Sequence, residues 1–578
     1  LATNTTGTQN AAFGSLSLNQ TTTGNNNAAY GHYALYSNTT GADNCAIGHA
    51  ALDANTTGSS NVAIGKDALT ANTTASSNVA IGRKALEANT TGTQNNAVGA
   101  KALDANTTGS FNCAFGNGAL GANTEGQENS AFGNNSLDAN TTGDNNTAYG
   151  ASSLGANTTA SNNTAIGQQA LTDNTTGASN TALGMLALGN NTTASDNTGI
   201  GYHALLSNTT GTYNTAIGRS CMGLNTTGTY NVAVGREALK LNTTGEQNVA
   251  VGANALDANT TASECTAVGY QALTSNTTGN ANTALGHNAL GSNTTGTLNT
   301  AVGWDALFSN TTAAYNNALG REALQNNTTG AQNNAFGFRA LEENTTADNN
   351  CAFGHQALEA NTTGHSNVAV GAFAADANTT GDRATAVGFE ALTDSNGSEN
   401  TAIGYQSMHD STSGSHNAAL GDSSGANITS GTGNTCIGRR GGESVTTGDN
   451  NTIVGYQAGG NGTYRTGSNS MILGYLAYPS ANDVSNEITL GNSSISTLRC
   501  NQTSISSLSD ARDKTDVIDI PVGLDFINSI RPVKFKWQRR EPDANDGLVR
   551  AGFIAQELQE AQKNSEYLDL VMDNNPDK

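Results

Sequence analysis

Charged and aromatic side chains are scarce in this chain of 578 residues. Charged residues make up 12% of it and aromatic residues 5%, whereas soluble proteins usually carry about 25% charged residues. This composition does not favour a series of ordinary globular domains. The chain also contains 68 glycines, and polar, glycine-rich chains often stay disordered because they bury too little apolar surface. A stable fold must therefore come from the order of the residues.

Basic patches and long apolar runs are absent as well. The formal net charge of -22 argues against nucleic acid as a partner, because phosphate binding requires a basic surface. No apolar run reaches the roughly 18 residues of a membrane span, so no membrane insertion is expected. No signal segment follows Leu1, which is not an initiator Met. We therefore expect the chain to begin inside a longer gene product whose attachment end is missing.

The seven cysteines are odd in number and lack the spacing of metal ligands. Cys45, Cys113 and Cys351 occupy one position of the repeat described next, and Cys265 and Cys436 occupy others. We interpret them as small buried substitutes and not as a disulfide framework. No metal and no cofactor are predicted.

A 17-residue repeat dominates the sequence. The unit reads N-T-T-G-x-x-N-x-A-h-G-x-x-A-L-x-x, where h is a large apolar residue, and 23 such units run from residue 4 to about 394. The glycine after h never varies, which indicates a backbone with positive φ or a chain passing too close for a Cβ. The glycine of N-T-T-G is sometimes Ala, as at Ala75 and Ala160. The register then slips by one residue near Ser395 and continues in looser form.

A unit of this length with two glycine corners suits one coil of a parallel β-solenoid. Each strand would pair with its copy in the next coil, about 4.8 Å away, and recurring Asn and Thr would form side-chain ladders. The Asn-Thr-Thr triplets also match the N-glycosylation sequon, but the ladder explains them better. A solenoid of helix pairs needs about 33 residues per unit, although a coil with one helical turn remains an alternative.

Each coil offers one Leu, one large apolar residue at h and two Ala for burial, which is a thin core for a single chain. This predicts that several chains pack side by side. The phrases N-V-A-I-G-K-D-A-L at 61–69 and N-T-A-I-G-Y-Q-S-M at 400–408 resemble the head repeats of trimeric autotransporter adhesins. That resemblance implies a trimeric β-roll, although the adhesin repeat is shorter than the repeat of this chain.

Composition changes near the C-terminus. All five prolines lie beyond residue 478, and 24 of the last 70 residues are charged. We predict four segments: a regular shaft over 1–394, degenerate repeats over 395–478, a neck over 479–508 and a small α/β domain over 509–578. In the neck, Ile488, Ile495, Leu498, Ile505 and Leu508 would form a short trimeric stalk.

In the last segment, the pattern predicts strands at Val517–Ile520 and Val533–Trp537, and helices at Gly523–Ile530 and Gly552–Ala561. The motifs L-S-D-A-R-D-K at 508–514, L-D-F-I-N-S-I-R-P-V-K-F-K-W at 524–537 and G-F-I-A-Q-E-L at 552–558 closely resemble the intramolecular chaperone of endosialidase-type tail proteins. Members of this auto-processing peptidase family occur at the ends of phage tail fibres and spikes. The resemblance implies trimerisation, assisted folding of the preceding β-structure and self-cleavage.

Ser509 and Lys514 match the serine–lysine dyad of that family, and Asp510 belongs to the same motif. A serine hydroxyl is a weak nucleophile without a nearby base, and a lysine can act as that base when its pKa is lowered. The expected activity is a single-turnover autoproteolysis next to Ser509. Family domains usually continue into a long C-terminal helix, so the domain is expected to be incomplete at Lys578.

The sequence thus predicts a mainly β, trimeric parallel β-solenoid fibre of 17-residue coils, followed by a small α/β chaperone domain. The expected function is that of a viral tail fibre shaft in host attachment, located in the virion tail. Expected partners are two further copies of the chain, a host receptor such as a glycan or outer-membrane component, and other tail proteins. A bacterial surface adhesin is the alternative.

A polysaccharide-degrading spike is less favoured, because glycoside hydrolysis needs paired carboxylates at a defined separation. Asp53, Glu87, Asp104 and Glu342 instead lie at variable repeat positions, where they are expected to be solvated.

Overall fold

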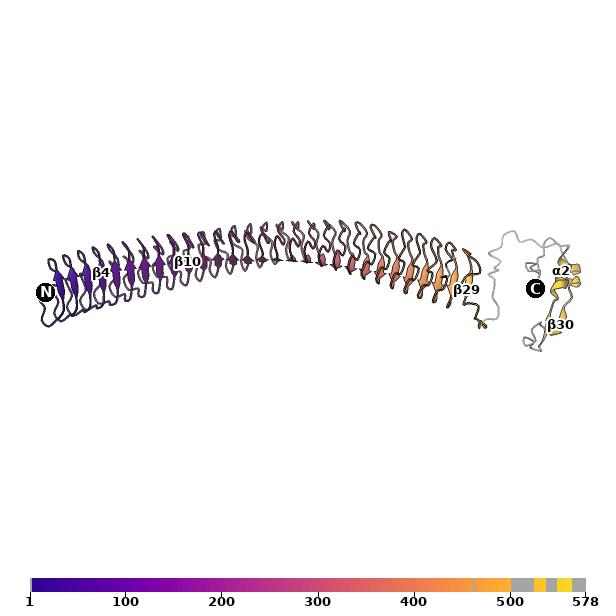
Figure 1. The fold of residues 1–578 in the computed structure, drawn as a ribbon, viewed down its shortest axis with the longest axis horizontal. Coiled ribbons are helices and arrows are strands. Elements are labelled where there is room, and N and C mark those ends of the chain that lie inside the picture. Colours follow the sequence, from indigo (N-terminus) through magenta and orange to yellow (C-terminus); the bar gives the residue numbers. More distant parts are fainter. Residues whose placement is uncertain (1–2, 461, 463, 500–523, 537–547, 564–578) are drawn as a thin grey trace. The chain divides into compact units, whose positions relative to one another are not determined.

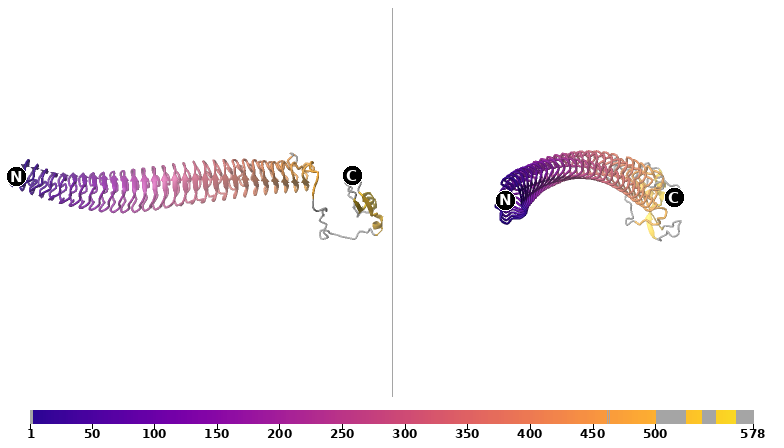
Figure 2. Two further views of the ribbon diagram at one scale, coloured as in Figure 1. Left: turned by 90° about the horizontal axis from the view of Figure 1, so that it is seen from below. Right: turned by 60° about the vertical axis from the view of Figure 1, so that its left-hand side comes forward.

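The computed structural model describes residues 3–460, 462, 464–499, 524–536 and 548–563. The chain divides into two compact units, Leu1–Ile495 and Ser496–Lys578. The first unit is a long, gently curved rod built from one row of strands and the turns between them (Figure 1). The views in Figure 2 show the same row of stacked coils from two other directions.

Every strand of the rod is three residues long, and together they form one sheet of 29 strands. The strands are β1 Ala11–Phe13, β2 Ala28–Tyr30, β3 Cys45–Ile47, β4 Val62–Ile64, β5 Val79–Ile81, β6 Asn96–Val98, β7 Cys113–Phe115, β8 Ser130–Phe132, β9 Thr147–Tyr149, β10 Thr164–Ile166, β11 Thr181–Leu183, β12 Thr198–Ile200, β13 Thr215–Ile217, β14 Val232–Val234, β15 Val249–Val251, β16 Thr266–Val268, β17 Thr283–Leu285, β18 Thr300–Val302, β19 Asn317–Leu319, β20 Asn334–Phe336, β21 Cys351–Phe353, β22 Val368–Val370, β23 Thr385–Val387, β24 Thr401–Ile403, β25 Ala418–Leu420, β26 Thr435–Ile437, β27 Thr452–Val454, β28 Met471–Leu473 and β29 Ile488–Leu490.

Each strand pairs in parallel with the strand of the next coil, so that equivalent repeat positions stack. Cys45 pairs with Val62, for example, and Ile47 with Ile64. The parallel β-solenoid of 17-residue coils is therefore confirmed. Two coils differ in length from the rest. The short coil, in which Thr385 pairs with Thr401, has one residue fewer, and the long coil, in which Thr452 pairs with Met471, has two more.

The last strand extends the solenoid beyond the regular repeats. β29 pairs with β28 in parallel, so Ile488 belongs to a coil of the rod and lies within the segment for which a neck was predicted. Residues 500–508 of that segment lie outside the described residues.

The segment between strands consists of turns, and the described part of the rod contains no helix. Its backbone also bonds from coil to coil: the amide of Leu52 donates to the carbonyl of Ala68 at 2.9 Å. In most coils three non-glycine residues have positive φ, as Asp43, Ala50 and Leu52 do. The alternative of a helical turn in each coil is thus wrong, because the turn residues bond to the neighbouring coils.

The core of each coil is a small cluster of two Ala and one Leu. Ala46, Ala51 and Leu52 are fully buried, and this pattern recurs along the rod. The large apolar residue at h is not part of this core: Ile47 is 40% exposed and Leu319 is 51% exposed. The expectation that h is buried within the chain is therefore wrong, because in a three-residue strand only the middle side chain points inward.

The invariant glycine after h meets both conditions inferred for it. Gly48 has φ +136, and a Cβ on it would lie 2.5 Å from the carbonyl oxygen of Gly65. A glycine is therefore required in each coil on conformational grounds and on steric grounds.

Asparagine ladders line the interior of the rod. The side chain of Asn55 donates to the Oδ1 atom of Asn38 at 2.9 Å and to the carbonyl of Gly58 at 2.9 Å. Links of this kind continue to Asn361, which donates to Asn344. The Asn of these N-T-T triplets is buried, so a glycan cannot be attached to it in the folded rod, and the ladder interpretation is confirmed.

The described residues of the second unit form two helices, α1 Leu524–Ser529 and α2 Ala555–Gln562, and an antiparallel pair of strands, β30 Val533–Lys536 and β31 Val549–Gly552. The first predicted helix and the strand after Pro532 are confirmed within a few residues. The second predicted helix starts later than expected, because Val549–Gly552 forms a strand. The predicted strand at Val517–Ile520 lies outside the described residues.

Candidate functional sites

The predicted catalytic residues Ser509, Asp510 and Lys514 lie outside the described residues. In the described part of the second unit, α1 precedes the antiparallel pair β30 and β31 along the chain, and α2 follows it. Phe535 pairs with Arg550 across β30 and β31. The guanidinium group of Arg531, between α1 and β30, bonds to the carboxylate of Glu557 in α2, with 3.2 Å between Nε and Oε2. This ion pair joins two of the three sequence motifs that carried the resemblance.

Apolar side chains of this second unit lie on its surface. Leu524, Ile527 and Phe553 are exposed, and no described residue of the unit is buried. Exposed apolar groups of this kind are typical of surfaces that meet a partner.

Carboxylates at one repeat position form a second group of interest. Asp53, Glu87, Asp104 and Glu342 all follow the core Leu, and each is half-buried. They are therefore less solvated than expected. Burial raises the pKa of Asp53 and of Asp104, and it raises the pKa of Glu342 to about 7 although the Arg339 guanidinium lies 3.4 Å away.

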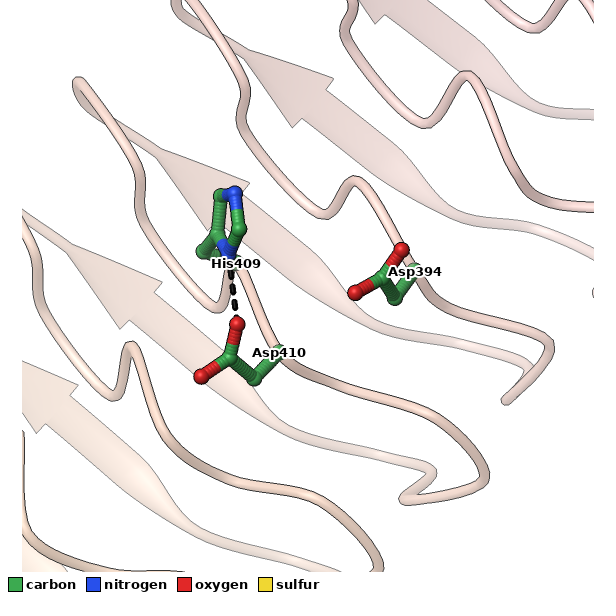
Figure 3. Close-up of side chains that lie close together, drawn as sticks. All are labelled: Asp394, His409 and Asp410. Atoms are coloured by element: carbon green, nitrogen blue, oxygen red, sulfur yellow. Dashed lines mark hydrogen bonds and ion pairs between the residues drawn. The ribbon is translucent and has the colours of Figure 1, made fainter.

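Figure 3 shows the one group of described residues whose donor atoms converge as metal ligands would. It consists of Asp394, His409 and Asp410, with ligand atoms all within 4.8 Å of one another. Asp394 in the short coil and Asp410 in the coil after it occupy the same position. The Nδ1 atom of His409 lies 2.6 Å from Oδ1 of Asp410, and both carboxylates are exposed, so the group is explained as a surface ion pair.

The cysteines divide into two kinds. Cys221, Cys265 and Cys436 are buried, and burial raises the pKa of Cys265 to about 11. Cys265 replaces a ladder Asn, and its Sγ atom donates to the carbonyl of Gly279 at 3.2 Å. Cys45, Cys113 and Cys351 begin strands and are only half-buried. The expectation of buried substitutes is therefore confirmed for Cys265 and Cys436 but wrong for these three.

Sequence reasoning missed the face of the sheet that lies away from the core. Each strand begins with a half-buried or exposed residue and ends with the apolar h residue, which is also half-buried or exposed. The signal was present, since the middle residue is nearly always Ala while h is always large. A three-residue strand that alternates in this way has one buried position and two outward ones.

Neither of the two described helices has the length or the apolar character needed to cross a membrane. No curated protein matches the chain in sequence. Residues 509–566 match the family described as the chaperone of endosialidase. This match and the solenoid of 17-residue repeats together fit a tail fibre that carries a C-terminal domain of the chaperone-of-endosialidase family.

Proposed function

We propose that the chain is the shaft of a viral tail fibre that takes part in host attachment, and that its C-terminal domain drives trimerisation and folding of the shaft. The observation that carries the proposal is the combination of a long parallel solenoid with a chaperone-of-endosialidase match at its end. The rod gives the fibre its length, and the chain's net charge of -22 favours solubility and self-repulsion between fibres.

The architecture itself explains why a chaperone is needed. Because nearly every coil carries the same pattern, a strand can pair with the wrong coil and still bury an Ala and a Leu. Side-chain register is then weakly specified by the coils alone. While the rod forms, its last coil also exposes an unpaired strand edge that can pair with another chain. A domain that brings the chains together at one end would align them before the coils form.

The proposed partners follow from this role. Copies of the chain form the shaft, other tail proteins hold it in the virion, and a glycan or outer-membrane component of the host is the receptor. Single-turnover autoproteolysis at Ser509, with Lys514 as base, belongs to the proposal as the step that releases the chaperone.

The experiment compares the full chain with a variant that lacks residues 496–578, the second compact unit. The full chain should give soluble trimers with a mainly β circular dichroism spectrum, measured together with mass by light scattering. The truncated chain should aggregate or stay monomeric, because its coils lack the domain that aligns them.

A deletion of similar size within the rod is the control. Removal of residues 208–292 joins Ser207 to Asn293 in the repeat register and should leave shorter but trimeric rods. If the chain without residues 496–578 forms the same trimers as the full chain, the chaperone role is wrong. The attachment role is tested separately, by whether the purified fibre blocks adsorption of the virus that encodes it.

A further inference from the structure

We infer that copies of this chain associate, parallel and in register, through one defined face of the rod: the outward side chains of strands β1–β29. We call this the seam face, and it consists of the first and third residue of each strand. The inference rests on the proposed assembly of copies and adds which surface they share.

The third residues of the strands form an apolar ridge on the seam face that runs the whole length of the rod. The third residue of each strand is always Ile, Val, Leu, Phe or Tyr, and many of these are exposed, including Ile217 at 38% and Leu285 at 47%. Some stack along the ridge, with 4.9 Å between the rings of Phe115 and Phe132 and 4.5 Å between those of Phe336 and Phe353.

The seam face carries no charge. No residue in the 29 strands is charged, although the chain as a whole carries 70 charged residues and a net charge of -22. Charged residues lie close to the strands in sequence: Lys66 and Arg83 directly follow the invariant glycine, and Asp43 lies two residues before β3. Copies of an acidic protein repel each other through most surfaces, and the core of a protein interface is depleted in charge. The seam face is uncharged, and its third residues are large and apolar, so it suits an interface between copies.

The area is sufficient for a stable interface. If each h side chain leaves roughly 70 Å² exposed, 29 coils offer roughly 2,000 Å² per chain, against the roughly 800 Å² per partner of a standard interface. Contiguous exposed apolar surface of that size is rare on monomeric proteins. Copies of the same chain fit it best, because they offer an equally long ridge with the same coil spacing.

A parallel, in-register arrangement follows from the two irregular coils. The short coil and the long coil each occur once among the paired strands. Only an unshifted parallel alignment places each irregular coil beside its own copy.

The first experiment introduces lysines on the seam face in every third coil and measures the oligomeric mass by light scattering. The substitutions are Ile64→Lys, Phe115→Lys, Ile166→Lys, Ile217→Lys, Val268→Lys, Leu319→Lys and Val370→Lys. We expect loss of trimers, and at least a tenfold weaker association, because desolvated lysines would face one another across the seam.

A control variant carries the same number of lysines in the same coils, at the exposed third residue of each N-T-T triplet: Thr57, Thr108, Thr159, Thr210, Thr261, Thr312 and Thr363. It should remain trimeric. Circular dichroism checks that both variants keep β-structure, which is expected because neither set reaches the core. If the seam variant keeps the mass of the unsubstituted chain, the inference is wrong and the proposed function stands. If the unsubstituted chain is itself monomeric, both are wrong.

A second experiment needs no change in the ridge. Cys45, Cys113 and Cys351 begin strands β3, β7 and β21 and lie on the same side of the sheet as h. In a Cys500→Ser background, a short bismaleimide should link chains through pairs of identical cysteines, as mass spectrometry of the linked peptides would show. Links between Cys45 and Cys351 would indicate antiparallel rods, and an absence of links between chains would contradict the seam face.

Discussion

At the scale of single residues, the two glycines of each coil both lie at corners, but only the glycine after h has a positive φ. Gly201 has φ +132, and a Cβ on it would lie 2.4 Å from the Gly218 carbonyl oxygen. Gly211 would also bring a Cβ close to the next coil, but its φ is not in the left-handed region. The equivalent residue one coil earlier is Ala194. The second position therefore admits a methyl group after a small shift of the coils, whereas the first is excluded by its backbone as well.

The same substitution at these two positions should therefore give unequal results. Gly201→Ala should lower the free energy of unfolding by about 1–3 kcal/mol or more, from backbone strain and the clash with the next coil. Gly211→Ala should lower it much less. Thermal unfolding followed by circular dichroism checks both, and equal melting temperatures for the two variants would contradict the assignment.

Buried asparagines stabilise the rod by bonding in two directions. Asn208 donates to Oδ1 of Asn191 at 2.9 Å and to the carbonyl of Gly211 at 2.9 Å, and it accepts from Asn225 at 2.8 Å. Asn208→Ala removes all three bonds and leaves buried polar groups without partners, so the free energy of unfolding should fall by roughly 2–4 kcal/mol. Thr210→Ala, an exposed change in the same triplet, is the control for denaturant unfolding. Equal midpoints would show that the ladder contributes nothing.

At the scale of the coil, side chains that stack in columns acquire properties that no single repeat shows. Asp376 follows its coil's apolar core, its Oδ1 atom is buried without a hydrogen bond, and Asp394 and Glu359 add negative charge nearby. Burial first, and these charges second, raise the pKa of Asp376 to about 6. Since its pKa is raised above the unfolded value, this group favours the folded state at low pH, and that contribution is lost as the pH rises from about 4 to about 6.

Asp376→Asn should therefore raise the melting temperature at pH 8, where the parent side chain is ionised, and change it much less at pH 4. Melting curves across this pH range provide the measurement. Asp196→Asn, at an exposed position with positive φ, is the matched control and should show no such trend. A stabilisation by Asp376→Asn that is the same at both pH values would indicate a cause other than ionisation.

At the scale of the whole molecule, the proposed cleavage at Ser509 would separate the shaft from the chaperone domain that follows it along the chain. If Ser509 is the nucleophile and Lys514 its base, the full chain should yield two bands on a denaturing gel. Ser509→Ala and Lys514→Ala should each yield one, because a hydroxyl without a base reacts slowly. Ser507→Ala should still yield two. Cleavage of the Ser509→Ala variant would eliminate the dyad.

Much of the rod was determined by the sequence alone. The 17-residue period, the invariant glycine and the repeated Asn define a parallel solenoid with stacked side-chain ladders, because identical residues at a constant spacing must lie over one another. The three C-terminal motifs likewise predicted the domain that residues 509–566 match. These features are local or periodic, so they can be read without knowing which way a side chain points.

Only the tertiary structure decided which side of each strand is buried. The sequence shows a large apolar residue at h beside a small Ala, and size favours burial of the larger one. In the rod the inward space of a thin coil is filled by Leu52 and its equivalents, which leaves room for Ala46 and none for Ile47. The apolar ridge and the half-buried carboxylates both follow from this packing, which depends on neighbouring coils and cannot be derived from one repeat.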